Sequence, residues 1–348
     1  MKVRKRGCLV LMLMLLAAAA YHGWQYCSTP AEAAFRHSFF AMNTFIDVSI
    51  YGEAGPQAAA LAEQRIRQLE ELLSVTATAS EIYAVNHSGG REILLSRDTA
   101  EVVRQALAAA RDTGGAFDPT IYPLLKLWGF TTEHKAVPAA AALEAKLSAV
   151  GYDKVKMKGA KLFLPEGMQL DLGGIAKGYA GTEAAKALRE QGITSALINL
   201  GGNVQTLGRK PDGSLWQIAV RDPWSEKYLG VLSVEDQAVV TSGDYERYFT
   251  GADGIKYGHI LDPHTGFPAR QGVAAVTVVG ADGGVCDALA TAFFVMGPER
   301  SAAWWRSGKG CEFLLVTEKQ EVYVTEGLLK NLALQPEFAA WPLKVVRR

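Results

Sequence analysis

The sequence predicts an α+β fold in which mixed or antiparallel sheets pack against helices. Helical periodicity is concentrated in the first half of the chain, whereas short segments rich in β-forming residues dominate the second half. The 348 residues are enough for one large domain or for two lobes in intimate contact. Because no repeat, low-complexity segment or clean linker interrupts the chain, residues 35–340 are expected to fold as a single unit.

The first half contains one predicted strand and three predicted helices. Phe39–Gly52 alternates in hydrophobicity and is rich in β-formers, which favours a strand. Apolar residues recur at helical spacing over Pro56–Ser74. A second helix is expected from Ser96 to a stop at Gly114, and a third within residues 136–151.

The second half is predicted to be mainly β. A hairpin is expected over residues 161–172, with its turn at Pro165–Gly167. A helix should follow Asp171 and end near Gln191. The remaining elements are strands at residues 194–200, 203–208, 215–222, 228–234, 237–243, 247–250, 257–262 and 273–280, a helix at 285–297 and a hairpin at 312–325.

Composition and charge exclude several classes of function. Hydrophobic residues make up 49% of the chain, charged residues 21%, and the formal net charge is zero. No basic stripe or arginine-rich arm is present, so nucleic-acid binding is not expected. The four cysteines form no disulfide framework, and the six histidines show no zinc-binding spacing.

The N-terminus has the features of an export segment. Met1–Gly7 is basic, and the apolar run Leu9–Ala20 that follows is too short for a comfortable membrane span. Ala31 and Ala33 then form an A-x-A cleavage pattern. We therefore expect residues 1–33 to be a signal peptide or an N-terminal membrane anchor, which places the protein on the periplasmic side of the inner membrane, anchored or released.

The stretch DLGGIAKGYA, Asp171–Ala180, forms a glycine-rich junction between a predicted strand and a helix. It fits neither the Walker phosphate loop nor the dinucleotide-binding fingerprint. Its glycines would let the backbone approach a ligand closely, and the helix N-terminus would offer free N–H groups to an anion. Asp171 would accept hydrogen bonds and Lys177 would face a phosphate. The alternative is a tight turn with Lys177 in solvent.

The segment VCDALATAFFVMG places an aspartate and a threonine on one helix face. Asp287 and Thr291 are four residues apart, so their side chains are neighbours. A carboxylate and a hydroxyl are hard oxygen ligands, suited to a Mg²⁺ ion that also binds substrate phosphates. The alternative is a capping aspartate and a threonine bonded back to its own helix.

Two further stretches carry candidate side chains. His259 ends a predicted strand before a turn built from Asp262, Pro263 and Gly266, where it could shuttle a proton or simply lie on the surface. The segment GGAFDPTIYPLLKLWGF packs aromatic residues and an aspartate between helix breakers, which suits an aromatic-lined pocket.

Taken together, these motifs resemble in identity and order the FAD:protein FMN transferase family, the ApbE-like flavin transferases. The resemblance covers residues 38–325 and runs through FFAMNT, SEIYAVN, GAFDPTIYPLLKLWGF, DLGGIAKGYA, ALINLGGNV, IAVRDP, VVTSGDYERYF, HILDPHTGFPA and DALATAFFVMG. It implies a catalytic domain over residues 35–340, with an FAD cleft between two lobes. It also implies Mg²⁺-dependent transfer of FMN from FAD to a Thr or Ser hydroxyl of an acceptor protein, which releases AMP.

The resemblance assigns roles to individual residues. It implies that His259 and Asp287 are catalytic and that Mg²⁺ is bound by Asp287, Thr291 and the carbonyl of Gly174. The residues that it places on FAD are Met42, Thr76, Ala116, Phe117, Asp118, Asp171, Lys177 and His259. The chain departs from the family pattern at Asn43, where many relatives have glycine, and at Thr76, where relatives often place an aromatic residue that stacks on the flavin.

The partner implied by the resemblance is a flavoprotein that carries a Ser/Thr flavinylation motif, such as a subunit of a membrane redox complex. Two other functions are compatible with the sequence. An FAD pyrophosphatase would use the same metal and cleft but transfer to water, giving FMN and AMP. A non-catalytic exported FAD-binding protein would bind FAD tightly and release no AMP.

Overall fold

A two-residue turn folds the N-terminal β-rich segment back on itself. Met42 and Asn43 both have positive φ, 51° and 57°, as in the turns that suit two-residue hairpins. The strands β1 (Phe35–Ala41) and β2 (Thr44–Ile50) therefore pair antiparallel. The prediction of one strand over Phe39–Gly52 is wrong, because the alternation continues through a turn that contains no glycine or proline.

The structure is a computed structural model that describes residues 33–132, 134–245, 247–308 and 310–348. Within it, Phe35–Arg348 forms one compact unit. The export segment predicted over residues 1–33 lies outside the described residues except for Ala33. Among the helices that are described, none has the length and hydrophobicity needed to cross a bilayer.

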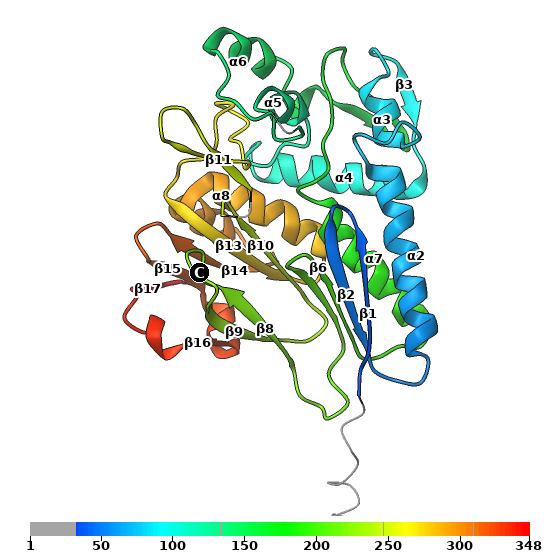
Figure 1. Cartoon of the computed structure of the whole chain (residues 1–348), viewed down its shortest axis with the longest axis vertical. Coiled ribbons are helices and arrows are strands. Elements are labelled where there is room, and N and C mark those ends of the chain that lie inside the picture. Colours follow the sequence, from blue (N-terminus) through cyan, green and yellow to red (C-terminus); the bar gives the residue numbers. More distant parts are fainter. Residues whose placement is uncertain (1–32, 133, 246, 309) are drawn as a thin grey trace, which may run out of the picture. The chain divides into compact units, whose positions relative to one another are not determined.

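Nine strands form the central sheet, in the order β1-β2-β6-β7-β10-β13-β14-β15-β17 (Figure 1). Its strand pairs are antiparallel except β15 and β17, which are parallel. The strands after β2 in this sheet are β6 (Ala196–Leu200), β7 (Asn203–Leu207), β10 (Ala238–Gly243), β13 (Val273–Gly280), β14 (Glu312–Thr317), β15 (Val322–Thr325) and β17 (Leu343–Val346).

Helices cover one face of the central sheet. α7 packs on β6 and β7, and α8 packs on β10 and β13. Their apolar side chains form the main core together with α2 and α4. The bounds of the helices are α2 (Gly55–Leu73), α3 (Glu81–Asn86), α4 (Arg97–Asp112), α5 (Tyr122–Leu127), α6 (Ala140–Leu147), α7 (Ala176–Glu190) and α8 (Gly283–Arg306), with 3-10 turns at Tyr152–Lys154, Glu326–Asn331 and Pro336–Phe338.

The opposite face of the central sheet carries a smaller sheet. β8 (Trp216–Arg221), β9 (Tyr228–Val234) and β16 (Leu332–Leu334) pair in the order β16-β9-β8. Their inward side chains form a second core with residues of β10, β13, β14 and β15. The molecule is therefore layered as helices, central sheet and small sheet.

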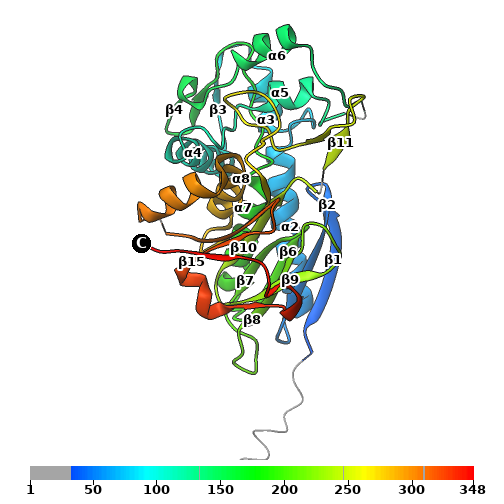
Figure 2. The same cartoon turned by 90° about the vertical axis from the view of Figure 1, so that its left-hand side faces the viewer.

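The α4, α5 and α6 helices and β3 lie at the same end of the molecule in both views (Figures 1 and 2). This lobe contains the sheet β3-β5-β4 and the hairpin of β11 and β12 lies close to it. Its strands are β3 (Glu92–Leu94), β4 (Lys156–Lys158), β5 (Lys161–Phe163), β11 (Tyr248–Thr250) and β12 (Lys256–Gly258). Trp128, which is buried, anchors a third core in this lobe.

The predicted hairpin over residues 161–172 is also wrong. β5 pairs with β3 and β4 instead of with the segment that follows it. Gln169 forms an isolated parallel bridge to Ile121, and the Asp171 amide donates to the Pro119 carbonyl at 2.8 Å. Residues 169–171, predicted to be the second strand of the hairpin, therefore pair with residues 119–121. This pairing brings Ala116–Asp118 beside Asp171.

The other elements follow the predicted pattern, with changes at their ends. Helices α2, α4, α6 and α7 confirm the first-half helices and the helix after Asp171, although α6 is shorter than expected. α8 begins at Gly283 and runs past Gly297, where φ is 79°, to Arg306. The strand expected over residues 257–262 ends at Gly258, and Leu261 forms only an isolated bridge to Pro268.

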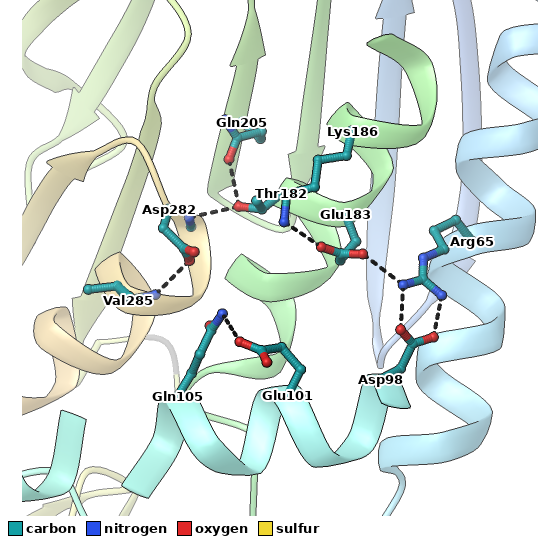
Figure 3. Close-up of polar contacts among 11 residues, drawn as sticks. Arg65, Asp98, Glu101, Gln105, Thr182, Glu183, Lys186, Gln205, Asp282 and Val285 are labelled. Carbon is teal, nitrogen blue, oxygen red and sulfur yellow. Dashed lines mark hydrogen bonds and ion pairs between the residues drawn. The ribbon is translucent and has the colours of Figure 1, made fainter. Parts of the chain in front are cut away.

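A cluster of salt bridges joins the three helices α2, α4 and α7. Arg65 of α2 donates two hydrogen bonds to Asp98 of α4, at 2.5 and 2.9 Å, and one to Glu183 of α7, at 2.8 Å (Figure 3). Lys186 donates to the second oxygen of Glu183 at 2.7 Å. The side chains of Arg65 and Glu183 are only 19% and 16% exposed, so solvent screens this network less than it screens a surface pair.

Arg65→Met should lower the free energy of unfolding by roughly 2 kcal/mol, because it leaves the half-buried carboxylate of Asp98 without its ion-pair partner and leaves Glu183 paired with Lys186 alone. Arg104→Met is the matched control, since Arg104 pairs with Glu101 on the exposed side of α4. Its cost should stay below about 0.5 kcal/mol. Urea unfolding of both variants measures the difference, and equal losses would show that the Arg65 cluster has no special weight.

Candidate active site

A cavity of about 260 Å³ lies where the lobe that contains α5 meets β10, α7 and α8. Most of the predicted site residues line it. Its walls come from the segment after α4, the start of α7, the end of β10, the segment after β12 and the first turns of α8. The predicted residues that line it are Ala116, Phe117, Asp118, Asp171, Gly174, Lys177, His259, Asp287 and Thr291.

The glycine-rich junction lines the cavity through Asp171, Gly173, Gly174 and Lys177. The Gly173 amide donates to Asp171 Oδ1 at 2.6 Å, which curls the chain into the start of α7. Lys177 lies in the first helical turn and lines the cavity. The junction therefore faces the cavity, and the alternative of a bare turn with Lys177 in solvent is not what the structure adopts.

Two glycines allow α7 and α8 to cross at backbone contact. A Cβ on Gly178 would lie 2.0 Å from the Gly283 carbonyl oxygen, and a Cβ on Gly283 would lie 2.4 Å from the Gly178 carbonyl oxygen. No larger residue fits at either position without separating the helices. At this crossing the Gly178 amide donates to Asp287 Oδ2 at 2.9 Å.

Asp287 and Thr291 share the cavity-facing side of α8. The capping role belongs to Asp282, whose side chain accepts from the Val285 amide at 3.1 Å, so Asp287 is not the helix cap. Asp287 is buried, and burial raises the pKa of its carboxyl, while Lys177 and the Gly178 N–H oppose that shift. Among the described residues it forms no ion pair.

The donor set around Asp287 fits a magnesium ion. A Cβ on Gly174 would lie 3.4 Å from Thr291 Oγ1, so the Gly174 backbone and the Thr291 hydroxyl are close neighbours. One carboxylate, one hydroxyl and one carbonyl are the hard oxygen ligands that Mg²⁺ takes together with water and substrate phosphates. The described residues contain no cluster of three His, Cys, Asp or Glu side chains that could hold a metal ion.

Asp118 is fixed by its own surroundings. Its Oδ1 accepts from the amide and hydroxyl of Thr120 at 2.8 and 2.6 Å, and its Oδ2 accepts from the Tyr152 amide at 2.9 Å. Burial raises the pKa of this carboxyl, and these hydrogen bonds oppose the shift. Asp118 thus forms a rigid part of the cavity wall next to Phe117.

His259 is held in one tautomer. Its Nδ1 lies 3.1 Å from the Arg247 carbonyl oxygen, which also accepts from the His259 amide at 3.0 Å. Because a carbonyl oxygen only accepts, Nδ1 must carry the proton and Nε2 must hold a lone pair. Burial, together with the charges of Arg247 and Lys177, lowers the pKa of His259 to about 4, although the hydrogen bond to the Arg247 carbonyl opposes this shift. The ring is therefore neutral at pH 7.

Arg247 is a cavity residue to which sequence reasoning assigned no role. It lines the cavity, and its charge lowers the pKa of Asp171, which burial raises. Together with Lys177 it places two cations beside the two carboxylates Asp171 and Asp287. Its place between the strands predicted at residues 237–243 and 247–250 was the available signal, but arginines at strand ends are usually solvated.

Met42 and Thr76 lie apart from the cavity lining. The Met42 amide donates to Glu70 Oε1 at 2.6 Å near the end of α2, and Thr76 is exposed in the loop that follows α2. The two residues thus occupy the same end of α2, and their contact with FAD stays a prediction.

Residues 42–315 match the model of the ApbE family. The chain belongs to the ApbE family. Relatives named FAD:protein FMN transferase include one from Klebsiella pneumoniae, 36% identical over 75% of this chain and 83% of its own length. Another, from Treponema pallidum, is 35% identical over 84% of this chain and 86% of its own length. The resemblance seen in the motifs is confirmed.

Solved structures of ApbE proteins have the same fold. The ApbE protein from Thermotoga maritima superposes with a TM-score of 0.81 at 32% identity and covers 86% of this chain and 99% of its own. The flavin transferase ApbE from Vibrio cholerae superposes with a TM-score of 0.79 at 28% identity, over 87% of this chain and 100% of its own. The predicted α+β class is confirmed.

Gly178→Ala should separate α7 from α8 and lower the free energy of unfolding by more than about 2 kcal/mol, since the new methyl overlaps a backbone carbonyl. Gly181→Ala on the same helix is the control. Its Cβ would meet only the side chains of Leu200 and Gln205, at 3.1 and 3.4 Å, so it should be tolerated much better. Thermal unfolding compares them, and an unchanged melting temperature in Gly178→Ala would contradict the crossing.

Proposed function

We propose that this protein transfers FMN from FAD to a Thr or Ser hydroxyl of an acceptor protein and releases AMP. The observation that carries the proposal is that one cavity brings together three kinds of group. They are oxygen ligands suited to a metal ion, a neutral histidine and two cationic side chains. Membership of the ApbE family supports it, because the relatives are named FAD:protein FMN transferase.

In the proposed reaction the acceptor hydroxyl attacks the phosphorus on the FMN side of the diphosphate. A new oxygen–phosphorus bond forms while the bond from that phosphorus to the bridging oxygen breaks, and AMP leaves with the bridging oxygen. The hydroxyl proton passes to Nε2 of His259, the ring nitrogen that holds the lone pair. Positioning and charge neutralisation supply most of the catalysis in phosphoryl transfer.

The other residues of the cavity would bind the diphosphate and neutralise its charge. Lys177 and Arg247 are placed to offset the negative charge of the diphosphate, and the first amides of α7 add their dipoles. Asp287, Thr291 and the Gly174 carbonyl would hold Mg²⁺, which would supply positive charge to stabilise the negative charge of the diphosphate. Phe117 and Phe130 close the cavity with apolar surface that excludes water.

We further propose that the reaction takes place outside the cytoplasm. The basic N-terminus and the apolar run Leu9–Ala20 support export to the periplasmic side of the inner membrane. The acceptor would be an exported or membrane-bound flavoprotein, such as a subunit of a redox complex.

The direct test incubates the protein with FAD, Mg²⁺ and an acceptor that carries a Ser/Thr flavinylation motif, followed by mass spectrometry and AMP assay. Transfer predicts an acceptor heavier by FMN, less water, and one AMP per event. Asp287→Asn should lower the rate at least about 100-fold, because loss of a direct ligand costs more than loss of an outer partner. Asp282→Asn, which keeps an N-cap on the same helix, should leave the rate near wild type.

Other outcomes would assign a different function. Free FMN and AMP without a modified acceptor would mean that water is the natural nucleophile. Tight FAD binding with no AMP under any condition would mean a carrier protein. Equal rates in wild type and Asp287→Asn would remove Asp287 from the metal site.

The transfer rate should be flat near neutral pH and should fall as the pH drops below about 5. The reason is that the pKa of His259 is lowered to about 4, so protonation of Nε2 removes the base only in that acidic range. His259→Gln should slow transfer by about 100-fold or more and remove this acidic limb. His264→Gln, in the exposed part of the following turn, is the control that should keep both. Retention of the acidic limb by His259→Gln would exclude His259 as its origin.

A further inference from the structure

Strand β7 presents two polar side chains to the crossing of α7 and α8. Asn203 and Gln205 are two residues apart on this strand, so they share one face, and both are buried. Gln205 Oε1 accepts from the Thr182 hydroxyl at 3.1 Å, and Thr182 Oγ1 accepts from the Gly283 amide at 2.8 Å (Figure 3). This face of β7, which also carries Asn203, therefore points toward the N-terminal turn of α8.

Asn203 differs from Gln205 because part of its amide is unpaired. The side chain is 4% exposed, and its Nδ2 has no hydrogen-bond partner among the described residues. An unpaired buried donor of this kind destabilises the fold, because the hydrogen bond to water that it loses on burial is not replaced. Buried polar groups are nearly always paired, so an unpaired one calls for a functional explanation.

The unpaired amide lies beside the Asp287 carboxylate. It helps to lower the pKa of that carboxyl against the effect of burial, although its Nδ2 stays outside hydrogen-bonding geometry. Asp287 Oδ2 already accepts from the Gly178 amide at 2.9 Å. A carboxylate has acceptor sites for further donors, so the remaining lone pairs of Asp287 can serve both Asn203 and a cation.

The turn before Asn203 is tightly packed and hydrogen-bonded. Gly201 and Gly202 have φ of 60° and 98°, and the Gly202 amide donates to Asn199 Oδ1 at 2.8 Å. A Cβ on Gly201 would lie 2.0 Å from Thr44 Oγ1, so this turn is clamped against β2. The start of β7, and with it Asn203, is therefore fixed by contacts to β6 and β2.

We propose that Asn203 is a positioning residue: when the metal ion binds, its unpaired Nδ2 donates to Asp287 and holds the carboxylate in the orientation that the metal ion requires. The inference rests on the proposed function, because it takes Asp287 as the metal ligand. Outer partners of this kind change metal affinity by about 10–100-fold. A residue that only stabilised the fold would act on the metal-free protein instead.

The test variant is Asn203→Leu, which keeps the shape of the side chain and removes its polarity. Mn²⁺ serves as the probe, and its binding to the purified protein is followed by electron paramagnetic resonance. The dissociation constant should rise about 10-fold or more. The melting temperature of the protein in chelator should stay level or rise, because the variant removes an unpaired buried donor. The Mg²⁺ concentration for half-maximal transfer should rise more than the maximal rate falls.

Two further variants make the result specific. Asn199→Ala removes the side chain that caps the same turn on the side away from Asp287, and it should bind Mn²⁺ like wild type. Asn203→Ala, which avoids any steric conflict with leucine, should show the same loss of Mn²⁺ affinity as Asn203→Leu.

The outcomes separate this inference from the proposed function. If wild type shows no saturable Mn²⁺ binding, the proposed metal site fails and the inference fails with it. If wild type binds Mn²⁺ and both Asn203 variants bind it equally well, only the inference is overturned. It is also overturned if Asn203→Leu melts well below wild type in chelator at unchanged Mn²⁺ affinity, or if Asn199→Ala loses as much affinity.

Discussion

The contact between α7 and α8 at Gly178 and Gly283 is the constraint on which the site depends. It brings the start of one helix against the start of another, so that a backbone amide of α7 holds the buried carboxylate of Asp287. Only glycine lets two backbones approach this closely. The same crossing sets Thr291 beside Gly174, which assembles hard oxygen donors from two elements that are more than a hundred residues apart.

The electrostatics of the cavity follow from its burial. Removal from water raises the pKa of Asp171 and Asp287 and lowers that of His259. Lys177 and Arg247 oppose the shifts of the two carboxyls and reinforce that of the histidine. These charges support the proposal that the site takes a divalent cation and an anionic diphosphate together, with a neutral imidazole beside them. None of these groups would behave in this way on an exposed surface.

Local pattern predicted most elements because their periodicity is strong. The stripe along α2, the serine cap of α4 and most of the short strands of the second half agree with the final structure. The failures lie where partners are distant in sequence. Residues 161–172 look like a hairpin, yet their second arm bonds to Pro119 and Ile121, and the turn at Met42–Asn43 interrupts an unbroken alternation.

By itself the sequence determined the α+β class and the family, because motif identity, order and periodicity are local properties. It also identified the kinds of side chain that line the cavity: carboxylates, a hydroxyl, a lysine and a histidine. It also placed Asp287 and Thr291 on one helix face, since four residues make about one turn. Only the tertiary structure decided the tautomer of His259, the presence of Arg247 in the cavity and the approach of Asn203 to Asp287. Each of these depends on a contact between distant segments, which packing creates and no local pattern encodes.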